Sequence, residues 1–195
     1  MKRKTHSTTH HRILVVTGKL FSERGYFGVS MQDIATELGI TKAALYYHFT
    51  SKDALAELLL RNSLNELKIE LKNAVSSSTL PSDVVFTIVK TLLDFKIRHP
   101  EISLLSSLGA GNDERSPILE TVIEVRQELF KFIRTLVVGL DFSRRITYRA
   151  IATVVGSMIS LTLSPFLMET KQSSKQTAKN ISQLLLSGAD GKSAQ

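Results

Sequence analysis

The sequence predicts an all-α protein. Apolar residues recur every three or four positions over most of the chain, and no stretch alternates between polar and apolar residues as a strand does. Glycine, proline and hydroxyl-bearing caps divide this pattern into nine predicted helices. Hydrophobic residues make up 43% of the 195 residues, which is enough for a packed core and excludes a disordered chain.

Local stop and start signals place the first four helices. They are predicted over about residues 11–24, 31–38, 42–48 and 52–74. Gly25 and Gly39 end the first two helices, because glycine adopts the left-handed conformation that closes a helix. Ser30, Thr41 and Ser51 are well suited to cap the next three.

Five more helices are predicted after a serine-rich loop at 76–78. They cover about residues 82–98, 101–108, 117–138, 143–168 and 173–187. Pro100 stops the first of these, and Pro117 is well placed as the first residue of a helix. The segment 150–168 has no charged residue and approaches transmembrane length. Its five hydroxyl side chains and Pro165 instead favour a buried helix.

The charge is concentrated at the N-terminal end. Residues 1–50 carry seven basic and three acidic groups, and the whole chain has a net charge of +7. Such an excess indicates a polyanionic partner, either nucleic acid or an anionic membrane surface. Without cysteine or a secretory signal, the chain is expected to be cytoplasmic, and cysteine chemistry is excluded.

Residues 31–50, MQDIATELGITKAALYYHFT, have the pattern of a helix-turn-helix. Ala35 is small where two helices cross closely, and Gly39 supplies the sharp turn between them. Apolar contacts from Ile34, Leu38 and Leu45 would fix the crossing angle. The second helix is then placed to enter the major groove of DNA, whose width matches that of a helix.

The stretch from His11 to Leu58 resembles the DNA-binding domain of the tetracycline-repressor (TetR) family of bacterial transcription regulators. The residues that carry the resemblance are LFSERGYFGVSMQDIATELGITKAALYYHFTSKDAL. The resemblance implies a two-domain, nine-helix architecture. Its expected parts are a flexible basic tail at 1–9, a helix-turn-helix domain at 10–52, a ligand-binding and dimerisation domain at 53–188, and a disordered tail at 189–195.

By this resemblance, four residues face base edges: Gln32, Lys42, Ala43 and Ala44. Glutamine can pair with adenine, lysine can reach guanine, and an alanine methyl can touch thymine. Simple helix packing remains an alternative role for the two alanines.

A second set is expected to contact phosphates. It consists of Ser30, Thr41, Tyr47, His48 and Lys52, because hydroxyls, imidazole and ammonium groups donate hydrogen bonds to phosphate oxygens. The interpretation of the basic run Lys2–Lys4 is open: it enters a minor groove, adds non-specific affinity for DNA, or is a solubilising tail. His6, His10 and His11 resemble a metal spacing only weakly, and no metal site or cofactor is expected.

The larger domain is expected to hold the effector. Phe95, Arg126 and Phe130 are the candidate pocket residues. Arg126 has apolar neighbours on its own helix, so it needs a partner such as an anionic effector or Asp94 or Glu101, unless its charged end reaches the solvent. The resemblance also implies a homodimer through helices near 143–168 and 173–187, with Ala178, Ile181, Leu184 and Leu185 at the interface. The alternative is that both are ordinary core helices.

The predicted function is a transcriptional regulator, a repressor that a small molecule releases from a palindromic operator; activation is also open. The alternative is a DNA-binding protein of the same fold that a protein partner controls or that organises DNA without a small effector. An enzyme is not expected, because the sequence has no glycine-rich phosphate loop, nucleophile elbow or paired metal-binding motif.

Overall fold

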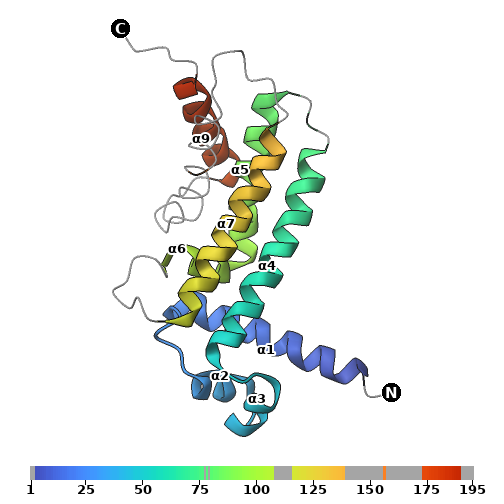
Figure 1. Ribbon diagram of the computed structural model, residues 1–195, viewed down its shortest axis with the longest axis vertical. Helices are drawn as coiled ribbons and strands as arrows, with labels where there is room; N and C mark the ends of the chain where they lie inside the picture. The colour runs from blue at the N-terminus through green and yellow to red at the C-terminus, as the bar shows by residue number, and fades with distance from the viewer. Residues whose placement is uncertain are drawn as a thin grey trace. The chain divides into compact units, whose positions relative to one another are not determined.

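The computed structural model describes residues 3–76, 78, 80–107, 116–138, 156 and 173–189. These residues form α-helices and one 3-10 helix, and none of them lies in a strand (Figure 1). The all-α prediction is therefore confirmed. The helix predicted over 143–168 lies outside the described residues, so the prediction of nine helices is not tested by them.

The helix boundaries follow the punctuation in the sequence. The elements are α1 (Arg3–Arg24), α2 (Met31–Leu38), α3 (Lys42–His48), α4 (Lys52–Val75), α5 (Pro81–Arg98), the 3-10 helix η1 (Pro100–Ser103), α6 (Leu104–Ser107), α7 (Pro117–Val137) and α9 (Ser174–Ala189). The single short helix predicted over about 101–108 is divided into η1 and α6. Apart from this division and the start of α1, each boundary of the described elements falls within two residues of the predicted one.

The start of α1 differs from the prediction. The sequence predicts a flexible tail over residues 1–9 and a helix from about His11, whereas α1 begins at Arg3. No glycine or proline interrupts residues 3–17, so nothing in the covalent structure stops the helix from extending beyond its apolar part.

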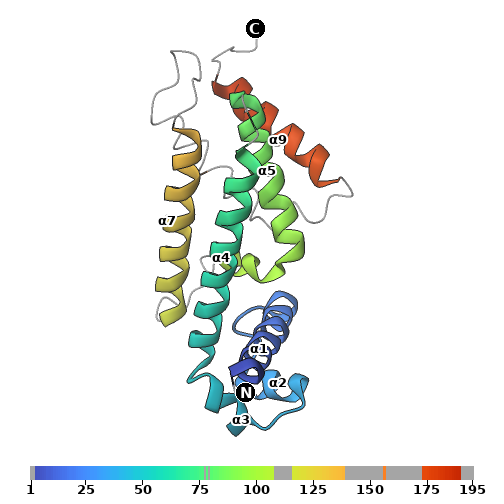
Figure 2. The ribbon, with the colours of Figure 1, turned by 90° about the vertical axis from the view of Figure 1, so that its right-hand side faces the viewer.

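The chain divides into two compact units, and the division falls within α4 and α7. Unit 1 contains Met1–Ser63 and His99–Val125, and unit 2 contains Leu64–Arg98 and Arg126–Gln195. Unit 1 thus includes the predicted helix-turn-helix domain together with η1 and α6. In Figure 2, α2 and α3 lie beside α1 in this unit.

The core of unit 1 is built from the apolar faces of its helices. Ile34 and Ala35 of α2 are fully buried, as is Leu45 of α3. Phe21 of α1 is also buried and packs against Tyr26, with ring centroids 5.4 Å apart. These contacts confirm the predicted inner face of the helix-turn-helix.

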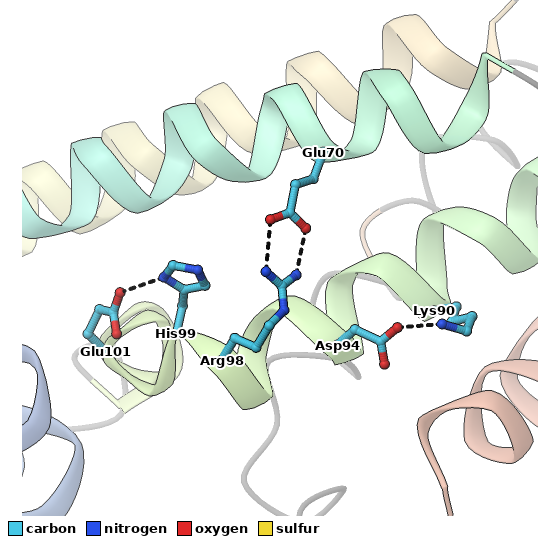
Figure 3. Close-up of polar contacts among 6 residues, drawn as sticks. All are labelled: Glu70, Lys90, Asp94, Arg98, His99 and Glu101. Carbon is cyan, nitrogen blue, oxygen red and sulfur yellow. Dashed lines mark hydrogen bonds and ion pairs between the residues drawn. The ribbon is translucent and has the colours of Figure 1, made fainter.

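Unit 2 joins α5 to α9 and α4. Val85 and Val89 of α5 form a buried cluster with Ala178 and Ile181 of α9. Ala178 and Ile181, two of the residues expected at the dimer interface, thus pack on α5 within the same chain, as the alternative of a core helix predicts. Arg98 joins α5 to α4 through two hydrogen bonds to Glu70, of 3.0 and 2.6 Å (Figure 3).

The turn between α2 and α3 depends on backbone conformation at Gly39. Its φ is 69°, and a Cβ added there would meet nothing within 4 Å, so only the left-handed conformation opposes a side chain. We expect Gly39→Ala to lower the free energy of unfolding by about 1 kcal/mol in urea titrations. Gly39→Asn should lose less, because asparagine tolerates this conformation. Equal stability of all three proteins would contradict the assignment.

Candidate nucleic-acid interface

The first helix of the motif begins at a reciprocal capping box. The Ser30 hydroxyl accepts a hydrogen bond from the Asp33 amide (3.2 Å), while the Asp33 carboxylate accepts from the Ser30 amide (2.8 Å). The helix ends at Gly39, whose amide donates to the Thr36 carbonyl (3.1 Å), and the next amide, of Ile40, donates to the Ala35 carbonyl (3.0 Å). Both ends of α2 are therefore held by local hydrogen bonds.

The second helix of the motif, α3, packs against the protein through one side only. Thr41 caps its start by accepting from the Ala44 amide at 3.1 Å, and Leu45 is its one buried residue. Phe49 follows the helix and is also buried, and its amide donates to the Leu45 carbonyl (3.0 Å). Phe49 therefore anchors the end of this short helix.

The opposite side of the motif is exposed. The four residues predicted at base edges are all exposed: Gln32, Lys42, Ala43 and Ala44. The methyl groups of the two alanines are thus not consumed by helix packing. Tyr47 is 76% exposed, which is unusual for an aromatic side chain on a structured helix. All five residues are thus exposed on the two helices of the motif.

The two capping hydroxyls differ in what they have left to donate. The Ser30 hydroxyl donates to the Asp33 carboxylate at 2.6 Å, so its proton is already used inside the protein. The Thr41 hydroxyl accepts from an amide, and the contacts of the described residues give its proton no acceptor. Thr41 therefore has a donor for a ligand, and Ser30 offers one only if its bond to Asp33 breaks.

Lys52 is engaged differently from the expectation of a phosphate contact. Its ammonium group donates to the carbonyls of Tyr26 and Val29, both at 2.9 Å, and lies 4.1 Å from the centroid of the Tyr26 ring. The Tyr26 hydroxyl donates in turn to the carboxylate of Asp53. These contacts tie the turn after α1 to the start of α4.

The pKa values of this network reflect its burial. Desolvation, followed by the hydrogen bond to Asp53, raises the pKa of Tyr26 well above its usual value. Desolvation lowers the pKa of Lys52. The sequence did not show this network, although the adjacent Lys52 and Asp53 after the Ser51 cap were a visible signal.

His48 is held by aromatic contacts that the sequence did not predict. Its ring stands edge-on to that of His10, with centroids 5.1 Å apart, and 5.3 Å from that of Tyr47. The His10 ring also lies 5.0 Å from the Phe49 ring. The carboxyl end of α3 is therefore packed against α1.

The three candidate effector residues belong to unit 2. Phe95 is fully buried, with the guanidinium group of Arg98 5.6 Å from its ring centroid. Phe130 is half-buried, and its ring lies 3.8 Å from the position that a Cβ on Gly156 would take. Phe95 is thus part of the core, and Phe130 lies at its edge.

Arg126 is half-buried on α7, and burial lowers the pKa of its guanidinium group. Both acids considered as its internal partners are held elsewhere. Asp94 pairs with Lys90 at 2.5 Å (Figure 3). Glu101 accepts a hydrogen bond from Ser63 at 2.7 Å. No ion pair to Arg126 is found among the described residues.

In the described part of the chain, no helix is both long and apolar enough to cross a membrane, and no three potential ligand side chains are grouped to hold a metal ion.

Sequence reasoning missed Lys96, which is buried on α5 and has its pKa lowered by desolvation.

Comparisons with known proteins identify the family. The model of the bacterial regulatory proteins of the tetR family matches residues 13–59. The HTH-type transcriptional regulator SAB2452 of Staphylococcus aureus (strain bovine RF122 / ET3-1) is 31% identical over 133 residues, which are 66% of this chain and 71% of that protein. The chain belongs to the TetR family. It is therefore a DNA-binding transcriptional regulator.

Two further similarities extend beyond the DNA-binding domain of this TetR-family protein. The nucleoid occlusion factor SlmA of Pasteurella multocida (strain Pm70) is 26% identical over 185 residues, 90% of this chain and 93% of that protein. The solved structure of AibR, in complex with isovaleryl coenzyme A and operator DNA, covers 91% of this chain and 97% of its own with a TM-score of 0.74. At 18% identity, AibR shows that the fold is shared.

The capping box predicts a pH dependence for unit 1. Hydrogen bonds from the Ser30 side chain and backbone lower the pKa of Asp33 in the folded protein. A depressed pKa contributes stability above the unfolded-state value of about 4, and this stability is lost as the pH falls through the folded pKa. The destabilisation caused by Asp33→Asn should therefore be largest near neutral pH and shrink below about pH 4.

Urea titrations of the parent protein, Asp33→Asn and Ser30→Ala between pH 3 and 7 test this expectation. Ser30→Ala removes the donor side of the same bond, so its destabilisation should shrink over the same pH range. A difference from the parent protein that stays constant over the whole range in both variants would contradict it.

Proposed function

We propose that this protein is a repressor that binds a two-fold symmetric operator as a homodimer and leaves it when a small molecule binds. The observation that carries the DNA-binding part is the geometry of α3. Leu45 and Phe49 fix one side of this helix, while Lys42, Ala43 and Ala44 stand exposed at its start. A helix held in this way presents its first turn to a major groove.

Base reading is assigned to the exposed residues of α2 and α3. Lys42 supplies an ammonium donor for the acceptors of guanine, and Gln32 supplies an amide that pairs with adenine. The Gln32 amide also donates to the Thr36 hydroxyl at 3.3 Å, which keeps its side chain along α2. Ala43 and Ala44 are small enough to let the helix approach base edges and thymine methyl groups.

Phosphate contacts are assigned to Thr41, Tyr47 and His48, which border the same surface. The spare hydroxyl proton of Thr41 and the exposed phenol of Tyr47 support this assignment. We assign Ser30 and Lys52 a positioning role instead, because the Ser30 hydroxyl proton and two of the three ammonium donors of Lys52 are engaged within the protein. Their contribution to DNA binding is to hold α2 and the start of α4.

Two points support control by a small molecule. AibR, which shares the fold, was solved in complex with isovaleryl coenzyme A, a phosphate-bearing anionic molecule, and operator DNA. In unit 2, Arg126 is half-buried and lacks an ion pair in the described part of the chain. A desolvated guanidinium group gains most from an anionic partner. We therefore assign Arg126 to an anionic group of the effector, with Phe130 at the edge of its apolar part.

The homodimer follows from the symmetry of the proposed operator, since a two-fold site is read by two identical domains. The expected interface helices lie at 143–168 and 173–187. Because Ala178 and Ile181 pack on α5, we expect other residues of α9 to form its part of the dimer interface.

The alternative function also has a specific observation in its favour. SlmA, named as a nucleoid occlusion factor, matches 90% of this chain. In that case the protein would organise DNA or respond to a protein partner, without a small effector. A thermal-shift screen separates the two candidates, because only a ligand-gated regulator gains stability from a small molecule that also weakens DNA binding.

The first experiment identifies the operator sequence. Selection from a random pool of duplex DNA should return a two-fold symmetric site. On that site, Lys42→Ala should cost about 1–3 kcal/mol and relax the preference at one base pair of each half-site. Lys179→Ala, an exposed lysine of α9, is the matched control and should change neither quantity.

Lys52→Met distinguishes positioning from phosphate contact. It should lower the free energy of unfolding by about 1 kcal/mol, because two carbonyls lose their donor. The slope of log affinity against log salt should stay unchanged, whereas loss of a phosphate contact reduces it by about 0.9 per contact. A shallower slope of log affinity against log salt in Lys52→Met would show that Lys52 contacts a phosphate. Failure to select any symmetric site would overturn the proposed function.

The effector assignment predicts a separation of ligand and DNA effects. For an anionic molecule found in the thermal-shift screen, Arg126→Gln should raise the concentration for half-maximal operator release at least about tenfold, since a charged hydrogen bond contributes about 1.5–3 kcal/mol. Operator affinity without ligand should not change. Lys131→Gln, an exposed residue of α7, serves as the control. Equal release curves for both variants would exclude Arg126 from the effector site.

A further inference from the structure

The N-terminal part of α1 has an unusual composition. Residues 3–12 read RKTHSTTHHR, so every side chain carries a cationic group, an imidazole or a hydroxyl. The first acidic residue of the chain is Glu23. All these side chain types donate hydrogen bonds to phosphate oxygens, and none is apolar. An amphipathic helix that binds a membrane surface needs an apolar face, which this segment does not have.

The structure places the carboxyl end of this segment, at His10 and Arg12, next to the proposed DNA-binding surface. His10 packs on His48 and Phe49, at ring-centroid distances of 5.1 and 5.0 Å. Arg12 donates to the carbonyl of Leu38 at 3.3 Å, close to the turn of the helix-turn-helix. The helix is therefore fixed against α2 and α3 at this point, next to a residue assigned to phosphate contact.

Beyond His10 the helix continues to Arg3. Seven further residues of α-helix extend about 10 Å, at about 1.5 Å for each residue. Figure 1 shows the first turns of α1 projecting past α2 and α3. A duplex presents about one phosphate charge for each 1.7 Å of its axis, so this length spans several phosphates outside the base pairs that α3 reads.

We propose that residues 3–10 form a helical arm that binds the phosphate backbone of the DNA flanking each half-site. The arm is continuous with the proposed interface and complementary to DNA in charge. Its role is to lengthen the footprint and to strengthen binding without reading sequence. This inference rests on the proposed operator binding, but it adds a contact that the helix-turn-helix alone does not make.

The test compares two lengths of the selected operator. One duplex ends at the half-sites, and the other carries about six additional base pairs of arbitrary sequence on each side. We expect the parent protein to bind the longer duplex about tenfold more tightly at low salt, with a steeper salt dependence. Arg3→Gln/Lys4→Gln should remove most of this gain and reduce the slope by about 3 to 4 for a dimer.

A proline variant shows whether the arm acts as a helix. Thr8→Pro keeps every charge but interrupts the helix within the arm, between its basic residues Arg3 and Lys4 and the anchored residue His10. It should lose the gain from the longer duplex, while Thr8→Ala should keep it. If Thr8→Pro binds both duplexes like the parent protein, the segment acts as a flexible tail and the helical arm is wrong.

The outcomes separate this inference from the proposed function. Selective binding of the short operator with no gain from the flanks would overturn the arm and leave the operator binding intact. No selectivity for the operator at either length would overturn the proposed function itself. All variants should bind the short duplex like the parent protein, which also shows that they are folded.

Discussion

The DNA-binding surface depends on the burial of one side of a seven-residue helix. An isolated helix of this length does not form in water, because the cost of nucleation exceeds what so few hydrogen bonds return. In α3 the deficit is offset by the burial of Leu45, the Thr41 cap and the buried Phe49 that ends it. Because so little of the helix is buried, nearly all of its remaining surface is free to meet a ligand.

Much of unit 1 could be predicted from the sequence because its signals are local. Ser30, Gly39 and Thr41 act through hydrogen bonds to residues within five positions, so the residue types alone locate the helix ends. The buried face of α2 follows from helical periodicity. What the sequence could not give is the partner of each polar group. Lys52 was expected on DNA, but its carbonyl acceptors lie 23 and 26 residues earlier in the chain.

The same reason explains the other differences. The packing of His10 on His48 joins residues 38 positions apart, and no local sequence pattern predicts such a contact. Ala178 and Ile181 were correctly recognised as an apolar face of α9, but a helical period does not tell whether that face meets a second copy or the same chain. For Arg126 the helical period alone was sufficient, because its apolar neighbours on α7 already indicated that its charge needs a partner.

The contacts within unit 1 also limit how an effector can act. Arg12 ties α1 to the turn after α2, and Lys52 ties the turn after α1 to the start of α4. Glu101 of η1 is buried and accepts a hydrogen bond from Ser63 of α4. Together with the packing of His10 on His48 and Phe49, these hydrogen bonds link the helix-turn-helix to α1 and to the start of α4.

An effector would therefore act by moving the helix-turn-helix as a body and changing the separation of two recognition helices in a dimer. A hundredfold loss of DNA affinity requires about 2.7 kcal/mol of difference in effector binding between the two states. Distorting α3 itself would spend more than this on broken caps and exposed apolar surface. The same packing and caps that would let α3 read bases thus also make a rigid-body displacement the less costly way to release DNA.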